Sequence, residues 1–164
     1  MHMKSMFFIT TLLVSLSSLA AERVTHTVTV TAQIPTGTFY VLPVGDWMSS
    51  QLKLSVNPSS QKLEPIVKEL NMKSTIGPIK GFLSYPPVIV SGANNIGLTI
   101  KVAGVELTTT STELLNLADA RVGRQGSIEF IPAAGPTGGY IPGNYQGIVS
   151  MIFESEAPPA PPQT

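Results

Sequence analysis

The most regular alternation of apolar and polar residues lies near the N-terminus, over residues 23–34, where odd positions are polar and even positions are apolar apart from one histidine. A period of two residues is typical of a β-strand with one buried face. Because the first residues of a domain are usually frayed, a strand this regular needs a partner to bury its apolar face. The even positions are Val24, His26, Val28, Val30, Ala32 and Ile34, and the pattern does not predict the surroundings of His26.

Short apolar runs follow along the chain, separated by many of its 14 Gly and 14 Pro residues. Their close spacing predicts an all-β domain, either a sandwich or a barrel. In one run Leu52, Leu54 and Val56 alternate with polar residues, so we expect them to point inward. The predicted strands lie within 35–45, 51–56, 65–74, 78–90, 95–110, 126–133 and 145–155.

Three of these regions contain a predicted break or change of structure. The stretch 78–90 holds one or two short strands and is interrupted by Pro86 and Pro87. Ala103-Gly104 predicts a hairpin turn within 95–110. Residues 110–123 are the one helical candidate, capped by Ser111 or Thr112.

The last predicted strand, 145–155, is apolar on both faces. Val149, Met151 and Phe153 lie on one face, and Ile148 and Ile152 lie on the other. A strand of this kind is expected to be buried on both sides. After it, residues 156–164 contain four prolines, which predict a disordered or polyproline-II extension rather than a strand.

Residues 1–20 have the features of a secretory signal peptide. Lys4 precedes an apolar stretch over 6–16 that is too short to span a bilayer. Small residues place the cleavage site after Ala20, with cleavage after Ala21 as the alternative. We therefore expect an exported protein that does not span a membrane, although a buried N-terminal helix is the competing interpretation of this segment.

Composition narrows the class of protein further. Hydrophobic residues make up 43% of the chain, enough for a core, whereas charged residues make up 12%, against about 25% in typical soluble domains. The net charge is zero, so nothing indicates a nucleic-acid partner. The chain has no cysteine, so the exported domain would be held together without disulfides.

Few residues are suited to catalysis or metal binding. His26 is the only histidine after the N-terminal segment, which leaves no members for a catalytic triad or a His/Cys metal cluster. The acidic residues are scattered, and the glycine-rich stretch 135–139 lacks the Lys and Ser/Thr of a phosphate loop. We therefore expect no enzyme activity, cofactor or metal. Trp47 and the tyrosines could line a sugar site, but core packing or surface anchoring is the preferred interpretation.

Four stretches carry a resemblance to a known family. In order and spacing the chain resembles the major pilin subunits of alpha-class (class 5) chaperone–usher fimbriae, the colonisation-factor type of Gram-negative bacteria. In the last stretch Gly143, Tyr145, Gly147 and Val149 match the closing strand of the family. The four stretches are "THTVTVTAQIP" (25–35), "LKLSVNPSSQKLEP" (52–65), "VAGVELTTTSTELL" (102–115) and "PGNYQGIVSMIF" (142–153).

The resemblance implies an incomplete immunoglobulin-like β-sandwich completed by a donor strand from a neighbouring subunit, the strand-addition mode of recognition. It implies a donor strand at 21–35, a pilin domain at 36–155 and a Pro-rich flexible tail at 156–164. The donor side chains would be Val24, His26, Val28, Val30, Ala32 and Ile34, and the acceptor groove and closing strand would use Leu52, Leu54, Val56, Val149, Met151 and Phe153.

The resemblance also implies partners and a location. The subunit would form a homopolymer, assisted by a periplasmic chaperone and an outer-membrane usher, with a minor tip adhesin at the end of the fimbria. It would travel through the periplasm to the cell surface. One departure from the family is the tail, because the closing strand of the family normally ends the chain and its terminal carboxylate helps to dock the chaperone.

Two other classes of function compete with a structural shaft subunit. A secreted β-sandwich that binds sugars or host proteins is the first alternative, although a two-domain tip adhesin would be much longer than this chain. A secreted β-barrel enzyme is the second, and it would depend on His26. The expected function is therefore the major structural subunit of a bacterial surface fimbria that supports adhesion.

Overall fold

The structure is a computed structural model that describes residues 38–157. The described residues all belong to the unit Ile34–Thr164. The predictions made for the signal segment and the donor strand, and for residues 158–164 of the tail, lie outside this part of the chain.

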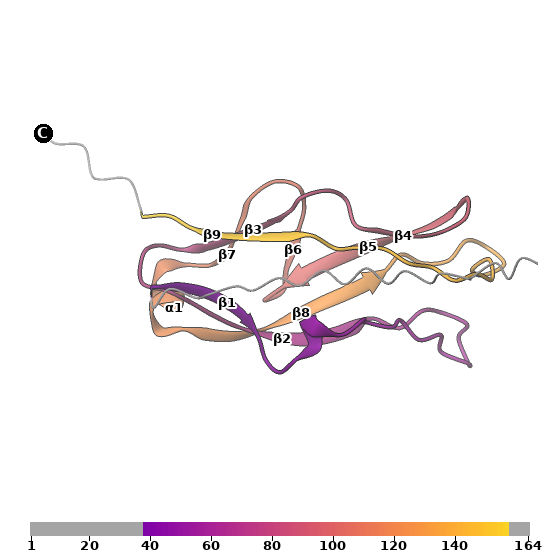
Figure 1. Ribbon diagram of the computed structural model, residues 1–164, viewed down its shortest axis with the longest axis horizontal. Coiled ribbons are helices and arrows are strands. Elements are labelled where there is room, and N and C mark those ends of the chain that lie inside the picture. Colours follow the sequence, from indigo (N-terminus) through magenta and orange to yellow (C-terminus); the bar gives the residue numbers. More distant parts are fainter. Residues whose placement is uncertain (1–37, 158–164) are drawn as a thin grey trace, which may run out of the picture. The chain divides into compact units, whose positions relative to one another are not determined.

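The described residues form an all-β domain with little helix, which confirms the predicted class (Figure 1). The strands predicted within 65–74 and 126–133 are present as β2 and β8. Pro86 and Pro87 separate β3 from β4, as the sequence predicts. The elements are β1 (Phe39–Pro43), a short 3-10 turn η1 (Trp47–Ser49), β2 (Ile66–Ser74), β3 (Ile79–Leu83), β4 (Val88–Ser91), β5 (Asn94–Val102), β6 (Val105–Leu107), β7 (Thr112–Leu115), α1 (Leu117–Val122), β8 (Arg124–Pro132) and β9 (Met151–Ser155).

The strands pair in two antiparallel sheets. The larger sheet has the order β1-β2-β8-β5-β4, with β6 also paired to β5, and the smaller sheet has the order β7-β3-β9. The predicted hairpin is β5–β6, and its turn residues Ala103 and Gly104 both have positive φ, at 50° and 81°. Positive φ at both central residues is the geometry that a tight two-residue hairpin turn requires.

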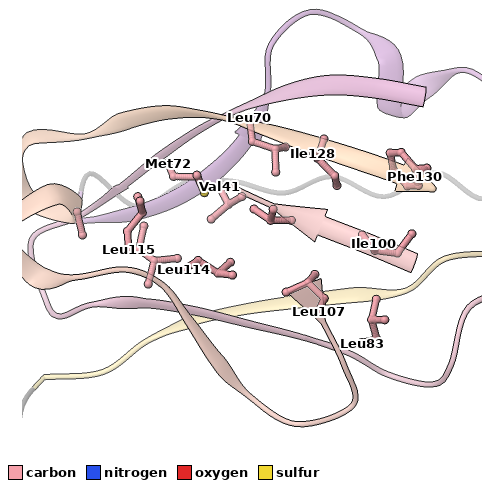
Figure 2. Packing of buried hydrophobic residues seen from close by; sticks show 13 residues of the cluster. Val41, Leu70, Met72, Leu83, Ile100, Leu107, Leu114, Leu115, Ile128 and Phe130 are labelled. Carbon is pink, nitrogen blue, oxygen red and sulfur yellow. The ribbon is translucent and has the colours of Figure 1, made fainter. Parts of the chain in front are cut away.

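The core lies between the two sheets (Figure 2). Leu70, Ile100 and Ile128 of the larger sheet are fully buried, and they belong to the same cluster as Ile79 and Leu83 of the smaller sheet. Each of these strands alternates buried and less buried residues, which is why a two-residue period in the sequence predicted them. The arrangement is a two-layer β-sandwich.

The helical prediction for 110–123 is only partly correct. Thr112–Leu115 form strand β7, and α1 begins later, after Asn116, whose side-chain Oδ1 accepts the Asp119 N–H over 2.9 Å. Leu114 and Leu115 are both buried in the core, at the point where the pairing of β7 with β3 shifts register between Ile79 and Lys80. The segment predicted as one helix is therefore a strand followed by a short helix, and Asn116 is the cap in place of Ser111 or Thr112.

The prediction of a strand at 51–56 is wrong. Residues 51–55 form no strand, and Val56 makes one isolated bridge to Leu63. The side-chain Oδ1 of Asn57 accepts the main-chain N–H groups of Ser59 and Ser60, which closes a tight turn directly after Val56. The chain then folds back on itself, since the Asn57 N–H donates to the Lys62 carbonyl and the Glu64 N–H donates to the Ser55 carbonyl, so the segment pairs locally and joins no sheet.

Candidate functional site

Strand β9 lies at the edge of the smaller sheet. It pairs with β3 in a register that runs from Ile79↔Ser155 to Leu83↔Met151. The chain before it stays beside β4, since Val90 and Gln146 exchange main-chain hydrogen bonds of 2.9 and 3.0 Å. Residues 146–155 thus follow β4 and then β3, and no strand within 38–157 pairs with their other edge.

The direction of the main-chain groups along this segment follows from its pairing. In an antiparallel pair, opposite residues alternate between those that exchange hydrogen bonds and those that do not. The Ser84 N–H donates to the Ser150 carbonyl over 3.0 Å, so this pair is of the hydrogen-bonded kind. Two residues along, Phe82 and Ile152 are opposite each other and are a pair of the same kind.

Met151 and Phe153 lie between these bonded pairs. Met151 is opposite Leu83, whose N–H donates away from β9, to the Thr108 carbonyl at 2.7 Å. By the same alternation, Met151 and Phe153 direct their main-chain N–H and C=O groups towards the outer edge of β9. A further strand added at this edge would find a ready row of donors and acceptors.

The side chains of the closing strand divide between its two faces. Val149, Met151 and Phe153 are partly buried and pack against the core cluster. Ile148 is 76% exposed and Ile152 is 41% exposed, so the prediction that both faces are buried is wrong for the described domain. In a two-layer sandwich only the inner face of a strand meets the other sheet, and nothing within 38–157 covers the outer face of β9.

A second group of incompletely covered apolar side chains comes from the stretch that begins with β1, at the edge of the larger sheet. Phe39, Trp47 and Leu52 are partly buried and pack against the same core cluster. Trp47 is held in place, because its Nε1 donates to the Glu69 carbonyl over 3.1 Å and its ring meets Phe130 edge to face at 6.1 Å. Partly buried side chains therefore border the core on two stretches that are far apart in sequence, residues 39–52 and residues 149–153.

The predicted site residues are only partly brought together. Leu52, Val149, Met151 and Phe153 all contact the core cluster. Leu54 is half-buried and Val56 is 52% exposed. The donor side chains Val24, His26, Val28, Val30, Ala32 and Ile34, and the cleavage positions Ala20 and Ala21, lie outside the described residues.

A polar cluster at the C-terminal end of β9 was not predicted from the sequence. Ser74 is 0% exposed, and its Oγ accepts the main-chain N–H groups of Ile76 and Gly77 at 3.1 and 3.3 Å. It also shares a 2.6 Å hydrogen bond with the Ser155 Oγ, which in turn donates to the Gly77 carbonyl over 3.1 Å. We call Ser74, Gly77 and Ser155 the serine clasp.

The clasp brings the main chain into close contact as well. A Cβ at Gly77 would overlap the main-chain carbonyl of Glu156, so only glycine fits beneath the end of the closing strand. Ser74 ends β2 of the larger sheet and Ser155 ends β9 of the smaller sheet, so the clasp ties the two sheets together. The sequence signal is weak, because a serine at the end of an apolar strand does not indicate a partner 81 residues away.

The remaining chemistry of the domain is sparse. Within 38–157, no three His, Cys, Asp or Glu side chains are grouped so that they could hold a metal ion. None of the helices in this part of the chain is long and apolar enough to cross a membrane. The features that the described domain offers for function are therefore its free strand edge and its partly covered core.

Comparisons with known proteins agree with this description. A family model described as "CS1 type fimbrial major subunit" matches residues 24–154. Among solved structures, the domain is similar to the CooA pilin subunit from enterotoxigenic Escherichia coli, with a TM-score of 0.54 and 19% sequence identity. That similarity covers 70% of this chain and 86% of the other. A search of curated proteins gives no match.

Proposed function

The chain belongs to the CS1 type fimbrial major subunit family, so it is a structural subunit of a cell-surface fimbria, and we propose that its copies polymerise by donor-strand exchange. In this proposal, residues 21–35 of one subunit add a strand to the free edge of the closing strand of the next. The observation that carries the proposal is the edge of β9, which no strand within 38–157 covers.

The two sides of the proposed joint have complementary chemistry. Met151 and Phe153 direct main-chain groups towards the free edge, and an added strand would satisfy them. Their side chains lie over the partly covered core, where alternate apolar side chains of a donor would be buried. Residues 24–34 supply that alternation, and the family match begins at residue 24, so it includes the proposed donor.

A joint of this kind is head-to-tail. Each subunit would use its N-terminal segment on one neighbour and its closing strand on the other, so the contact does not close on itself and generates a filament. Breaking it would require the removal of a strand from a folded sheet, which gives the fimbria kinetic durability.

The same free edge explains why a chaperone and an usher would be needed before assembly. An unpaired, partly apolar edge invites aggregation before assembly, so a periplasmic chaperone would cover it until an outer-membrane usher exchanges it for the donor. A minor tip adhesin would end the fimbria, and the shaft would support adhesion. Residues 156–164 follow the closing strand and lie beyond the end of the family match at 154, so the chaperone would either dock in a way that tolerates this tail or anchor the chain differently.

Substitution on the two faces of the donor strand tests the proposal. We expect Val30→Asp to reduce polymers to background, because it would place a carboxylate in the apolar groove at a cost of more than about 2 kcal/mol. Thr29→Asp, the matched control on the polar face, should polymerise. The readout is the ladder of polymers on unboiled denaturing gels. Equal ladders from both variants would contradict the proposed joint.

A further inference from the structure

The apolar pattern of the closing strand does not by itself fix how the strand pairs. Val149, Met151 and Phe153 repeat every two residues, so a slip of two residues along β3 would again turn apolar side chains towards the core. The main-chain hydrogen bonds of an antiparallel pair also repeat every two residues. Another feature must distinguish the native register from these alternatives.

The serine clasp is complete in only one register. A slip of two residues would set either Phe153 or Ala157 in the place of Ser155, and neither carries a hydroxyl group. The buried Ser74 Oγ would lose its short hydrogen bond, and the Gly77 carbonyl would lose its donor.

We propose that the serine clasp sets the register in which the closing strand pairs with β3. Through that register, the clasp would also fix the register of the proposed donor-strand joint, a step that rests on the proposed function. A donor strand pairs with the main chain of β9, so each of its side chains enters the groove at a point that the register of β9 sets. Ser74 and Ser155 thus act as positioning residues, and the clasp presents the same joint on every subunit.

The register can be read directly with engineered disulfides, because the chain has no cysteine of its own. The hydroxyl oxygens of Ser84 and Ser150 lie 2.9 Å apart across the strand pair, so Ser84→Cys with Ser150→Cys reports the native register. Ser84→Cys with Ile148→Cys, or with Ile152→Cys, reports a slip of two residues in either direction. In the native register these two pairs are diagonal and roughly 7–8 Å apart, beyond the usual reach of a disulfide.

Each reporter pair is introduced into the full chain, with and without Ser155→Ala, and the fraction of disulfide-linked protein is measured after oxidation. We expect Ser155→Ala to raise the slipped fraction about tenfold relative to the native pair, the factor that the loss of one to two net hydrogen bonds represents. Ser155→Thr keeps the hydroxyl group and should restore the native ratio. Ser74→Ala should raise the slipped fraction as Ser155→Ala does. If the variant at the buried Ser74 fails to fold, the result for Ser155→Ala, at a half-buried position, tests the proposal alone.

A matched control separates register from general stability. Asn116→Ala removes the cap of α1, away from β9, and should lower the melting temperature without raising the slipped fraction. An unchanged slipped fraction in Ser155→Ala would overturn the proposal. The polymer ladder is read in parallel. A chain with the Ser84→Cys/Ser150→Cys pair and an intact clasp that forms this disulfide but no polymer would contradict the proposed function, while the ratio of slipped to native-register disulfide still decides the role of the clasp.

Discussion

Removal of residues 22–35 is expected to abolish polymers while leaving a folded domain. The deletion keeps residues 1–20 for export and takes away the apolar face of the proposed donor strand. Burial of its larger side chains contributes roughly 1.5–3 kcal/mol each, so five apolar side chains contribute on the order of 10 kcal/mol to the joint. The described core is built from residues 41–130, outside the deletion.

The truncated chain also provides its own control. A synthetic peptide of residues 22–35 should bind it in a 1:1 complex seen by native mass spectrometry, and should raise its melting temperature by linkage. A peptide in which Val28 and Val30 are replaced by Asp should not bind. Polymers formed by the truncated chain would show that the joint uses another segment.

Substitution on the inner face of the closing strand is expected to be nearly as severe. Met151→Asp would place a carboxylate against the core cluster, at a cost of more than about 2 kcal/mol to the subunit and to any joint formed over it. We expect polymer yield to fall to background. Circular dichroism of the purified subunit measures how much of the loss is due to misfolding.

The neighbouring residue gives the matched control for this substitution. Ile152 lies on the same strand but is 41% exposed on its outer face, so Ile152→Asp should leave both folding and polymer yield close to wild type. A milder pair, Met151→Ala and Ile152→Ala, keeps the comparison useful if the aspartate variant does not fold. Equal loss from both residues would show that the two faces of β9 are equally involved, against the proposed geometry.

The strands that the sequence predicted well are those whose burial depends on one neighbouring sheet. In β2, Leu70 and Met72 are buried while Asn71 is exposed, and the sequence carries the same alternation. The hairpin after Val102 was also predictable, because Ala103-Gly104 suits a turn with positive φ. The family resemblance supplied the incomplete sandwich, which periodicity alone could not distinguish from a closed barrel.

The remaining features depend on contacts that no local pattern records. Leu54 and Val56 alternate like core residues, but the turn at Asn57 folds their segment back on the chain, so Val56 bridges to Leu63 and joins no sheet. Ile148 is as apolar as Val149, and only the absence of a covering layer within 38–157 leaves it exposed. The serine clasp joins two hydroxyl groups that are 81 residues apart in the sequence, so only the folded chain reveals it.

Amide hydrogen exchange along the closing strand tests the central claim most directly. The N–H groups of Ile152 and Glu154 point towards β3, so they should be protected both in the truncated subunit and in assembled fimbriae. The N–H groups of Met151 and Phe153 point to the free edge, so they should exchange quickly in the truncated subunit and become protected in fimbriae or with the donor peptide bound. Fast exchange of Met151 and Phe153 in intact fimbriae would contradict donor-strand exchange at this edge.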